Sequence, residues 1–169
     1  LIDAHNTGAP IAEMRRDVDM ASGGIDYFAG LIGEMKGETI PLGPGMLDYT
    51  LYQPLGVVAR IVAFNHPMMF AARAASAIAA GNAVIVKPAD QTPLSALRLA
   101  EIWRDCTPPG LFSVVTGGRS TAEALVRHPR VAKVPLVGSI EAGRAILHGC
   151  ADTIKPAALE LGGKNALIG

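Results

Sequence analysis

Glu160 is the acidic residue with the most suggestive surroundings in this sequence. It stands between two leucines in the run Leu-Glu-Leu-Gly-Gly-Lys at residues 159–164. Burial among apolar side chains raises the pKa of a carboxyl group toward the range that suits a general base. We therefore expect Glu160 to act as a catalytic base. The alternative is a strand carboxylate that faces solvent or pairs with Lys164.

Asn65 is a second candidate for chemistry, because it lies between a β-type run and a helical pattern. An amide N–H at such a turn can donate a hydrogen bond to an oxygen atom that gains negative charge during a reaction. The same side chain can instead cap the helix that follows, as Asn often does. The sequence leaves these two roles open.

Lys87 ends a short apolar run, and Asp90 follows three residues later. Open α/β sheets bind ligands at the carboxyl edge of their strands, so this pair is expected at a binding edge. A ribose diol suits the pair, because the ammonium donates hydrogen bonds and the carboxylate accepts them. The alternative is a solvated lysine at the end of a strand.

Small residues dominate the turn at residues 138–143, which reads Gly-Ser-Ile-Glu-Ala-Gly. Such a turn lets backbone N–H groups and the positive end of a helix approach a phosphate. The spacing differs from the GxGxxG fingerprint, and such glycines also occur in ordinary strand-to-helix connections. Gly138 and Ser139 are therefore candidates for phosphate binding.

The histidines and cysteines lack the spacings of metal sites. None of His5, His66, His128 and His148 lies in an HExxH or similar motif. Cys106 and Cys150 form no CxxC pair, and no serine lies in a GxSxG turn. We expect no metal site and no hydrolase triad, and we interpret both cysteines as packing residues on helices.

The composition of the chain limits the classes of binding partner that we expect. The chain has 169 residues, 50% hydrophobic and 18% charged, which is enough for one globular domain without disulfides. Its 15 Lys and Arg balance 15 Asp and Glu, so no excess positive field attracts nucleic acid or anionic lipid. The most apolar stretch, residues 67–81, is too short for a membrane helix and contains Arg73. We expect neither a nucleic-acid partner nor a membrane.

The elements that must position these residues alternate between β-type runs and helical patterns, with a period of roughly 25 residues. Strands are expected at residues 57–64, 83–86, 112–115 and 131–137, with a last extended stretch around 158–161 and 166–168. Helices are expected at 68–80, 93–105, 121–127 and 140–150. Continuous apolar strands indicate helices on both faces, and therefore an α/β fold with a doubly wound, mostly parallel Rossmann-like sheet. Pro135 conflicts with the fourth strand, because proline cannot donate a ladder hydrogen bond.

Two segments precede this alternation. Residues 1–40 are expected to be helical, with apolar residues three and four apart from Ile11 to Ile32 and with Pro10 at the first helical position. Residues 41–56 contain a turn and then a short β-prone run from Tyr49 to Tyr52, and are expected to form part of an arm outside the core. Residues 57–169 are expected to form a truncated dinucleotide-binding domain.

The order and spacing of six motifs resemble the aldehyde dehydrogenase superfamily. They are Pro-Leu-Gly-Val at 54–57, Asn-His-Pro at 65–67, Gly-Asn-Ala-Val-Ile-Val-Lys-Pro at 81–88, Pro-Gly at 109–110, Val-Gly-Ser at 137–139 and Leu-Glu-Leu-Gly-Gly-Lys-Asn at 159–165. The sequence departs from the family at Phe64, where Trp is usual, and at Leu136 and Val137, where Phe-Thr is usual. The resemblance implies oxidation of an aldehyde to a carboxylic acid through a cysteine thioester, with NAD as the cofactor and NADP as the alternative.

The resemblance also implies roles for individual residues. Asn65 resembles the oxyanion-hole amide of the family, and Glu160 resembles its general base. Lys87 would bind the adenosine ribose, Ser139 the pyrophosphate, and the Leu161 carbonyl the nicotinamide amide. The remaining cofactor-binding residues implied by the resemblance are Ile61, Phe64, Asp90, Gly118, Gly138 and Gly162.

Neither Cys106 nor Cys150 matches the context of the family's cysteine nucleophile. The chain opens on Leu1 without a signal peptide and ends on an apolar run before Gly169. We therefore expect a piece of a longer cytoplasmic enzyme, a homodimer or homotetramer at full length, with its thiol beyond Gly169. The alternative is a non-catalytic nucleotide-binding or assembly module. The aldehyde is not identified by the sequence. Asp90 favours NAD, whereas Arg119 offers a possible site for the extra phosphate of NADP.

Overall fold

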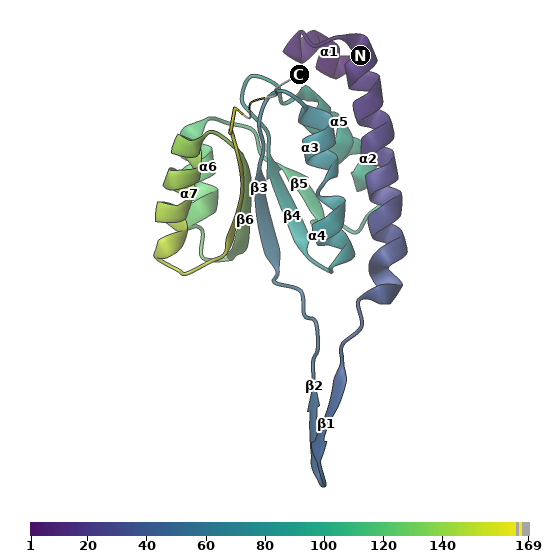
Figure 1. Cartoon of the computed structure of the whole chain (residues 1–169). Helices are drawn as coiled ribbons and strands as arrows, with labels where there is room; N and C mark the ends of the chain where they lie inside the picture. Colours follow the sequence, from purple (N-terminus) through teal and green to yellow (C-terminus); the bar gives the residue numbers. More distant parts are fainter. Residues whose placement is uncertain (165, 167–169) are drawn as a thin grey trace.

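A five-stranded parallel sheet forms the centre of the molecule in the computed structural model, which describes residues 1–164 and residue 166 (Figure 1). The strands lie in the order β5-β4-β3-β6-β7, and each neighbouring pair is parallel. They are β3 (Val57–Ile61), β4 (Ala83–Lys87), β5 (Phe112–Val114), β6 (Val131–Gly138) and β7 (Ala157–Leu161). All five lie where strands are expected, although β3 ends earlier. Of the further stretch expected at 166–168, residues 167 and 168 lie outside the described residues.

Helices cover both faces of this sheet. On one side lie α3 (Pro67–Ala72), α4 (Ala75–Ala79) and α5 (Leu94–Arg104), and on the other α6 (Arg119–Arg127) and α7 (Ile140–Ala151) (Figure 1). Successive side chains of β3 divide between the two layers, because Val58 belongs to the apolar core under α3–α5 and Ala59 to the core under α6 and α7. The expected doubly wound α/β fold is therefore confirmed.

The helix expected over residues 68–80 is wrong as a single element, because α3 and α4 are separated at Arg73 and Ala74. The Ser76 hydroxyl donates to the Arg73 carbonyl (3.0 Å), and the Ala77 N–H donates to Ala74 (3.1 Å). A side chain that takes a backbone acceptor competes with the regular bonds of a helix. The break therefore has a local cause, whereas α5, α6 and α7 lie close to their expected positions.

Pro135 lies in β6, an inner strand between β3 and β7. The Val134 N–H donates to the Pro156 carbonyl on the β7 side (3.1 Å). The nitrogen of the next residue therefore faces β3, because successive residues of a strand alternate their bonding direction. Within the described residues, β3 and β6 pair at Val58 with Lys133 and at Ile61 with Leu136, and no pair is formed at Pro135 between them. The sheet tolerates Pro135 by interrupting one ladder rather than by placing it at an edge.

Two helices open the chain. The first, α1 (Ile2–Thr7), and the second, α2 (Ile11–Leu31), lie in the segment that is expected to be helical, and α2 continues into a short 3₁₀ turn, η1 (Ile32–Glu34). The expected helical segment is wrong at its end, because Thr39 already belongs to a strand. Pro10 precedes α2 instead of being its first residue. Along α2, Met14 and Ala21 are buried, but Val18 of the expected apolar stripe is exposed. The helix packs across α3 and α4 and joins the layer on that side of the sheet (Figure 1).

An antiparallel hairpin projects away from the sheet (Figure 1). Its strands are β1 (Thr39–Gly43) and β2 (Met46–Tyr49), and every residue in them is exposed. Gly43 and Gly45 have φ angles of 127° and 77°, which glycine adopts most readily, so they place the turn at residues 43–46. The β-prone run expected to Tyr52 is wrong beyond Tyr49, because the chain leaves the hairpin there.

Candidate functional site

The carboxyl ends of β3, β4 and β6 lie at one edge of the sheet, because these strands are parallel neighbours. This carboxyl edge carries Asn65 in the loop after β3, Lys87 at the end of β4 and Ser139 after β6. Glu160 lies one residue before the end of β7, the neighbour of β6. The topology thus brings the expected catalytic and cofactor-binding residues to one edge.

Lys87 is buried, with 6% of its surface exposed, so the alternative of a solvated strand-end lysine is wrong. Burial lowers the pKa of its ammonium group, and the negative charge of Asp90 partly offsets this effect. Asp90 is exposed, and its Oδ2 lies 3.8 Å from the position that a side-chain carbon would take on Gly118. The charge of the Asp90 carboxylate therefore acts on the Lys87 ammonium, and the carboxylate itself lies beside a residue without a side chain.

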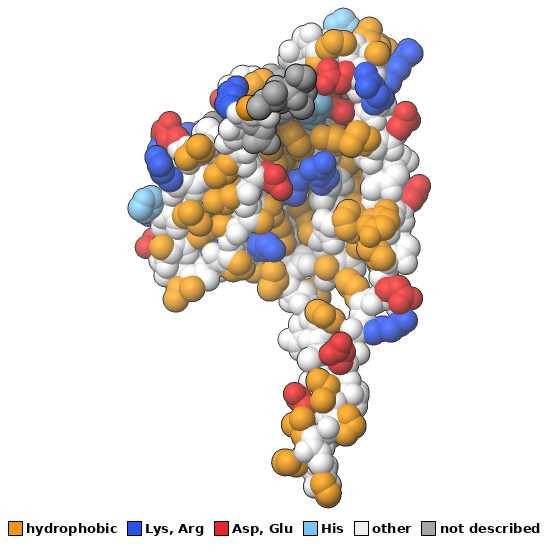
Figure 2. Space-filling model, viewed as in Figure 1, with side chains coloured by type: hydrophobic (Ala, Val, Ile, Leu, Met, Phe, Trp, Pro, Cys, Tyr) orange, Lys and Arg blue, Asp and Glu red, His pale blue; other side chains and the backbone are white. Residues whose placement is uncertain are grey.

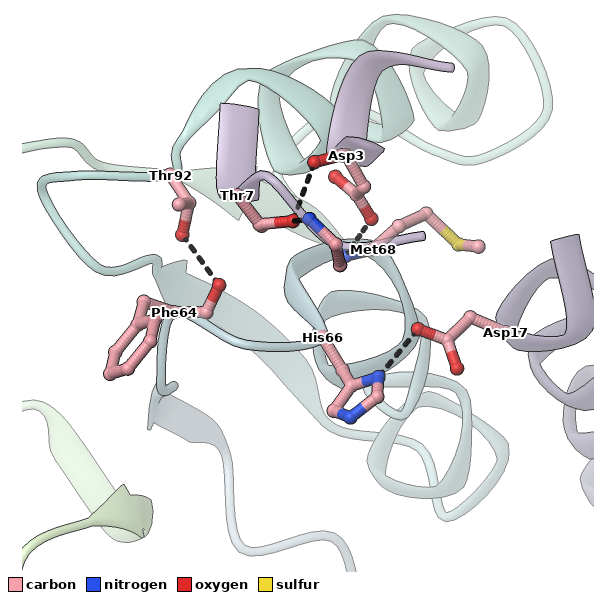
Figure 3. A network of polar contacts seen from close by, with 8 residues as sticks. Asp3, Thr7, Asp17, Phe64, His66, Met68 and Thr92 are labelled. Carbon is pink, nitrogen blue, oxygen red and sulfur yellow. Dashed lines mark hydrogen bonds and ion pairs between the residues drawn. The ribbon is translucent and has the colours of Figure 1, made fainter. Parts of the chain in front are cut away.

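Asn65 is exposed, and the residues on both sides of it are held by polar contacts (Figure 3). The Phe64 carbonyl accepts a hydrogen bond from Thr92 Oγ1 (3.1 Å), and His66 Nδ1 lies 2.7 Å from Asp17 Oδ2. The Phe64 side chain itself is 60% exposed.

A side chain from a distant part of the sequence accepts a hydrogen bond from the first turn of α3. Asp3 Oδ2 accepts the Met68 N–H at 3.1 Å (Figure 3). Helix capping is thus performed by Asp3, and the alternative role of Asn65 as a cap is wrong. The Asn65 amide lies exposed between fixed neighbours, as an oxyanion donor requires.

Glu160 is exposed, so its expected burial between two leucines is wrong. Leu159 and Leu161 face α7, where their Cδ1 atoms lie 3.6 Å and 3.0 Å from the position of a side-chain carbon on Gly143. Side chains alternate along a strand, so Glu160 points to the other face of β7. On that face its charge acts on Arg60 of β3.

Ser139 begins α7, and its Oγ accepts the Ala142 N–H at 3.1 Å. Gly138, just before it, is tightly placed, because a side-chain carbon there would lie 3.3 Å from Leu136 Cδ1. Next to this turn, a groove of about 600 Å³ opens between α6 and α7. Its apolar lining residues are Ile61, Val126, Leu136, Ala142 and Ile146.

Arg119 lies at the rim of the groove between α6 and α7. Its Nε donates to Glu123 Oε1 at 2.9 Å, and its Nη1 lies 3.9 Å from Glu141 Oε1. These carboxylates raise the pKa of the guanidinium. Two acidic residues therefore compete with any phosphate for this arginine.

The remaining predicted cofactor residues lie at the end of the sheet next to this groove. Leu161 is 39% exposed, and its side chain packs against Gly143 of α7. Gly162 follows directly and faces open space. Gly118 precedes α6 as its cap residue.

The two cysteines differ from each other. Cys150 is buried in α7, where burial raises the pKa of its thiol and Lys155 partly offsets the effect. Cys106 is exposed on the turn after α5, so its expected packing role is wrong. Among the residues that the structure describes, no group of three or more His, Cys, Asp or Glu side chains could hold a metal ion. No helix in this described part is long and apolar enough to cross a membrane.

Several residues that fix the site were missed at the level of sequence. Asp17 lies three residues after Met14 and four before Ala21, so the helical spacing itself places this acidic residue on the buried stripe of α2. An acidic residue at such a buried position of the helical pattern predicts a buried polar contact. Asp3 and Thr92 carry no comparable signal, because their partners are far away in the sequence.

Comparison with known proteins decides the family. The sequence model described as "Aldehyde dehydrogenase family" matches residues 1–168. The chain belongs to the aldehyde dehydrogenase family. This confirms the resemblance seen in the six motifs.

Individual aldehyde dehydrogenases align over nearly the whole chain. Aldehyde dehydrogenase tropH of Talaromyces stipitatus is 50% identical over 99% of this chain and 33% of its own length. The 4-trimethylaminobutyraldehyde dehydrogenase of Homo sapiens is 47% identical over 96% of this chain and 33% of its own. The chain thus spans about one third of the length of these relatives.

Solved structures share the fold of this chain. The crystal structure of PnpE from Pseudomonas sp. WBC-3 superposes with a TM-score of 0.94 at 38% identity, covering 98% of this chain and 35% of that one. PnpE has also been solved in complex with nicotinamide adenine dinucleotide, with a TM-score of 0.93. An Escherichia coli NADP dependent enzyme matches with a TM-score of 0.92 at 38% identity over 96% of this chain and 34% of that one. The aldehyde dehydrogenase chain thus has the Rossmann-like fold of enzymes described with either cofactor.

Proposed function

We propose that the whole protein oxidises an aldehyde to a carboxylic acid, with NAD as hydride acceptor and NADP as a second possible cofactor. The observation that carries this proposal is the buried ammonium of Lys87 beside the carboxylate of Asp90 at the carboxyl edge of the sheet. Burial of a lysine costs free energy unless polar partners compensate for its lost hydration. A ribose diol would supply such partners.

The residues around Lys87 fit the rest of a dinucleotide. Ser139 and the first N–H groups of α7 would bind the pyrophosphate, since a helix start favours negative charge. The groove between α6 and α7 would bind a nucleotide base of the dinucleotide, because its walls are apolar and its rim is charged. The other contacts in this proposal are Ile61, Phe64, Gly118, Gly138, the Leu161 carbonyl and Gly162.

Asn65 and Glu160 would serve the aldehyde. The Asn65 amide would donate to the carbonyl oxygen as it becomes an oxyanion. Glu160 would remove a proton from the water that hydrolyses the acyl-enzyme. The nucleophile would be a thiol of the whole protein other than Cys106 and Cys150, which lie on the turn after α5 and inside α7.

The hairpin of β1 and β2 would be part of an oligomerisation arm of a cytoplasmic homodimer or homotetramer. Its strands expose Ile40, Leu42, Met46, Leu47 and Tyr49, each at 41% or more. Apolar side chains exposed together are typical of surfaces that associate with another protein chain. In this proposed division into domains, residues 1–40 form the N-terminal helical segment of the dinucleotide-binding domain, whose main part is residues 57–169.

The test uses two lysines of contrasting exposure in the whole protein. Lys87→Gln should weaken the binding of NAD by about 10-fold or more, because a hydrogen-bonded charge is lost. Lys36→Gln should leave the dissociation constant unchanged, because Lys36 is 68% exposed and pairs with Glu34 on the protein surface. Formation of NADH with simple aldehydes measures the reaction. NAD binding without NADH formation would instead support a non-catalytic nucleotide-binding module.

A further inference from the structure

One face of β6 and β7 carries a group of charged side chains. The alternation along the strands puts Lys133 and Pro135 of β6, and Ala158 and Glu160 of β7, on the face that β3 turns toward α3. The helices that pack on β6 and β7, α6 and α7, lie on the opposite face (Figure 1). Figure 2 shows this face hollowed, with Lys or Arg and Asp or Glu side chains at the borders of the hollow.

A cavity of about 650 Å³ lies along this face, and it brings together three cations, Arg60, Arg73 and Lys133. Two of them meet at one residue. Arg60 Nε donates to the Phe70 carbonyl at 2.9 Å, and Arg73 Cζ lies 5.8 Å from the centroid of the Phe70 ring. Within the described part of the chain, none of the three cations has a carboxylate within 4.0 Å. The cavity is therefore positively charged.

The positive charge of Arg60 is disfavoured by its surroundings. Burial and the neighbouring charge of Arg73 lower the pKa of Arg60 to about 10, although Glu160 partly offsets them. The guanidinium still remains charged at neutral pH. Arg60 is half-buried, whereas Arg73 is exposed. Two like charges repel each other, and an anion between them removes that repulsion. The site thus favours an anionic ligand.

The rest of the cavity indicates what kind of anion. Most of the other lining side chains near the arginines are apolar, namely Val58, Val84, Ala77, Pro135 and Ala158. A hydrocarbon segment next to a charged group suits such a lining better than a free inorganic ion does. Guanidinium groups bind carboxylates in a planar, bidentate manner. An organic carboxylate therefore matches the cavity.

The cavity lies along the face of the sheet to which Glu160 also belongs. Ile61, the residue after Arg60, pairs with Leu136, Pro135 pairs with Ala158, and Glu160 follows two residues later. Strand spacings of about 4.8 Å and rises of about 3.3 Å separate the Cα atoms of Arg60 and Glu160 by roughly 12 Å.

We propose that the substrate is an aldehyde with a carboxylate at its far end, which Arg60 and Arg73 bind while the aldehyde lies near Asn65 and Glu160. This inference rests on the proposed function and specifies its substrate class. It separates this chain from relatives whose names refer to the cationic 4-trimethylaminobutyraldehyde and betaine aldehyde. A trimethylammonium group would be repelled at this position.

The test compares three aldehydes of similar length with the whole protein: anionic succinate semialdehyde, neutral butanal and cationic 4-trimethylaminobutyraldehyde. We expect kcat/KM to be highest for the anion and lowest for the cation. Arg73→Gln should lower the ratio of kcat/KM for succinate semialdehyde to that for butanal by about 10–100-fold. Arg73→Lys should restore a large part of the ratio, because it retains the positive charge.

Arg104→Gln is the matched control, because Arg104 is 76% exposed at the end of α5 and does not line the cavity. It should leave the ratio unchanged. An unchanged ratio in Arg73→Gln, or a preference for the cationic aldehyde, would overturn the proposal while leaving the dehydrogenase function intact. Arg60→Gln provides a second variant, with its folding checked by circular dichroism, because its Nε contact with Phe70 is structural.

Binding of glutarate, measured by calorimetry, separates this proposal from the proposed function. Glutarate binding that is lost in Arg73→Gln but retained in Arg104→Gln would support the anion site even if no aldehyde is oxidised. In that case the proposed function fails and the carboxylate site stands. Absence of glutarate binding together with absence of charge preference among the aldehydes would refute the site.

Discussion

His66 Nδ1 and Asp17 Oδ2 lie 2.7 Å apart and join the loop of Asn65 to helix α2 (Figure 3). The Asp17 side chain is 5% exposed and the His66 side chain 25%. A carboxylate accepts hydrogen bonds, so the imidazole N–H is the donor. Together with Thr92, which holds the Phe64 carbonyl, this pair fixes both neighbours of the proposed oxyanion donor.

Asp17→Ala should therefore lower stability and activity together. The free energy of unfolding should fall by about 1–3 kcal/mol, because a buried hydrogen-bond partner is removed. Asp19→Ala is the control, since Asp19 is exposed on the same helix. Urea denaturation of the whole protein and kcat at saturating cofactor measure the two effects. Equal behaviour of both variants would contradict a role for the His66 pair.

Asn65→Ala should reduce kcat by about 10²–10³, the usual effect of removing one oxyanion donor. The dissociation constant of NAD should change little, because the Asn65 amide is proposed to act on the aldehyde. Steady-state kinetics and a binding titration separate these quantities. A weakened NAD complex with normal kcat would move Asn65 from catalysis to cofactor binding.

Glu160→Gln should slow deacylation by about 10²–10⁴, because an amide cannot accept the proton of the attacking water. A rapid first turnover should survive, since the base is proposed to act after hydride transfer. Stopped-flow measurement of NADH detects this burst. The hypothesis fails if Glu160→Gln turns over normally, and also if the burst itself disappears.

NAD should bind more tightly than NADP. The Asp90 carboxylate beside Lys87 accepts hydrogen bonds from ribose hydroxyls and repels a 2′-phosphate. Arg119, the competing influence, is already engaged by Glu123 at 2.9 Å. The measurement is the dissociation constant of each cofactor. We expect the ratio of the NADP constant to the NAD constant to be smaller in Asp90→Ala than in the unchanged protein. Tighter NADP binding that disappears in Arg119→Ala would identify Arg119 as the determinant instead.

The fold was predictable from sequence because each strand is a mostly apolar run that alternates along the chain with helical patterns. The burial of Lys87 and the exposure of Glu160 could not be predicted from the sequence, because both depend on which neighbouring elements cover the end of a strand. The contact of His66 with Asp17 joins residues 49 positions apart, which no local pattern encodes. At the break near Arg73 the Ser76 hydroxyl donates to the Arg73 carbonyl, and residue spacing alone does not specify such a side-chain contact.

The hairpin of β1 and β2 has a thermodynamic consequence. A two-stranded ribbon is at best marginally stable in water, and here each residue of both strands is exposed. Its intrinsic free energy of folding is therefore close to zero. If another surface buries its apolar side chains, the order of the arm and the association of the protein become one coupled equilibrium, and protein concentration then governs both.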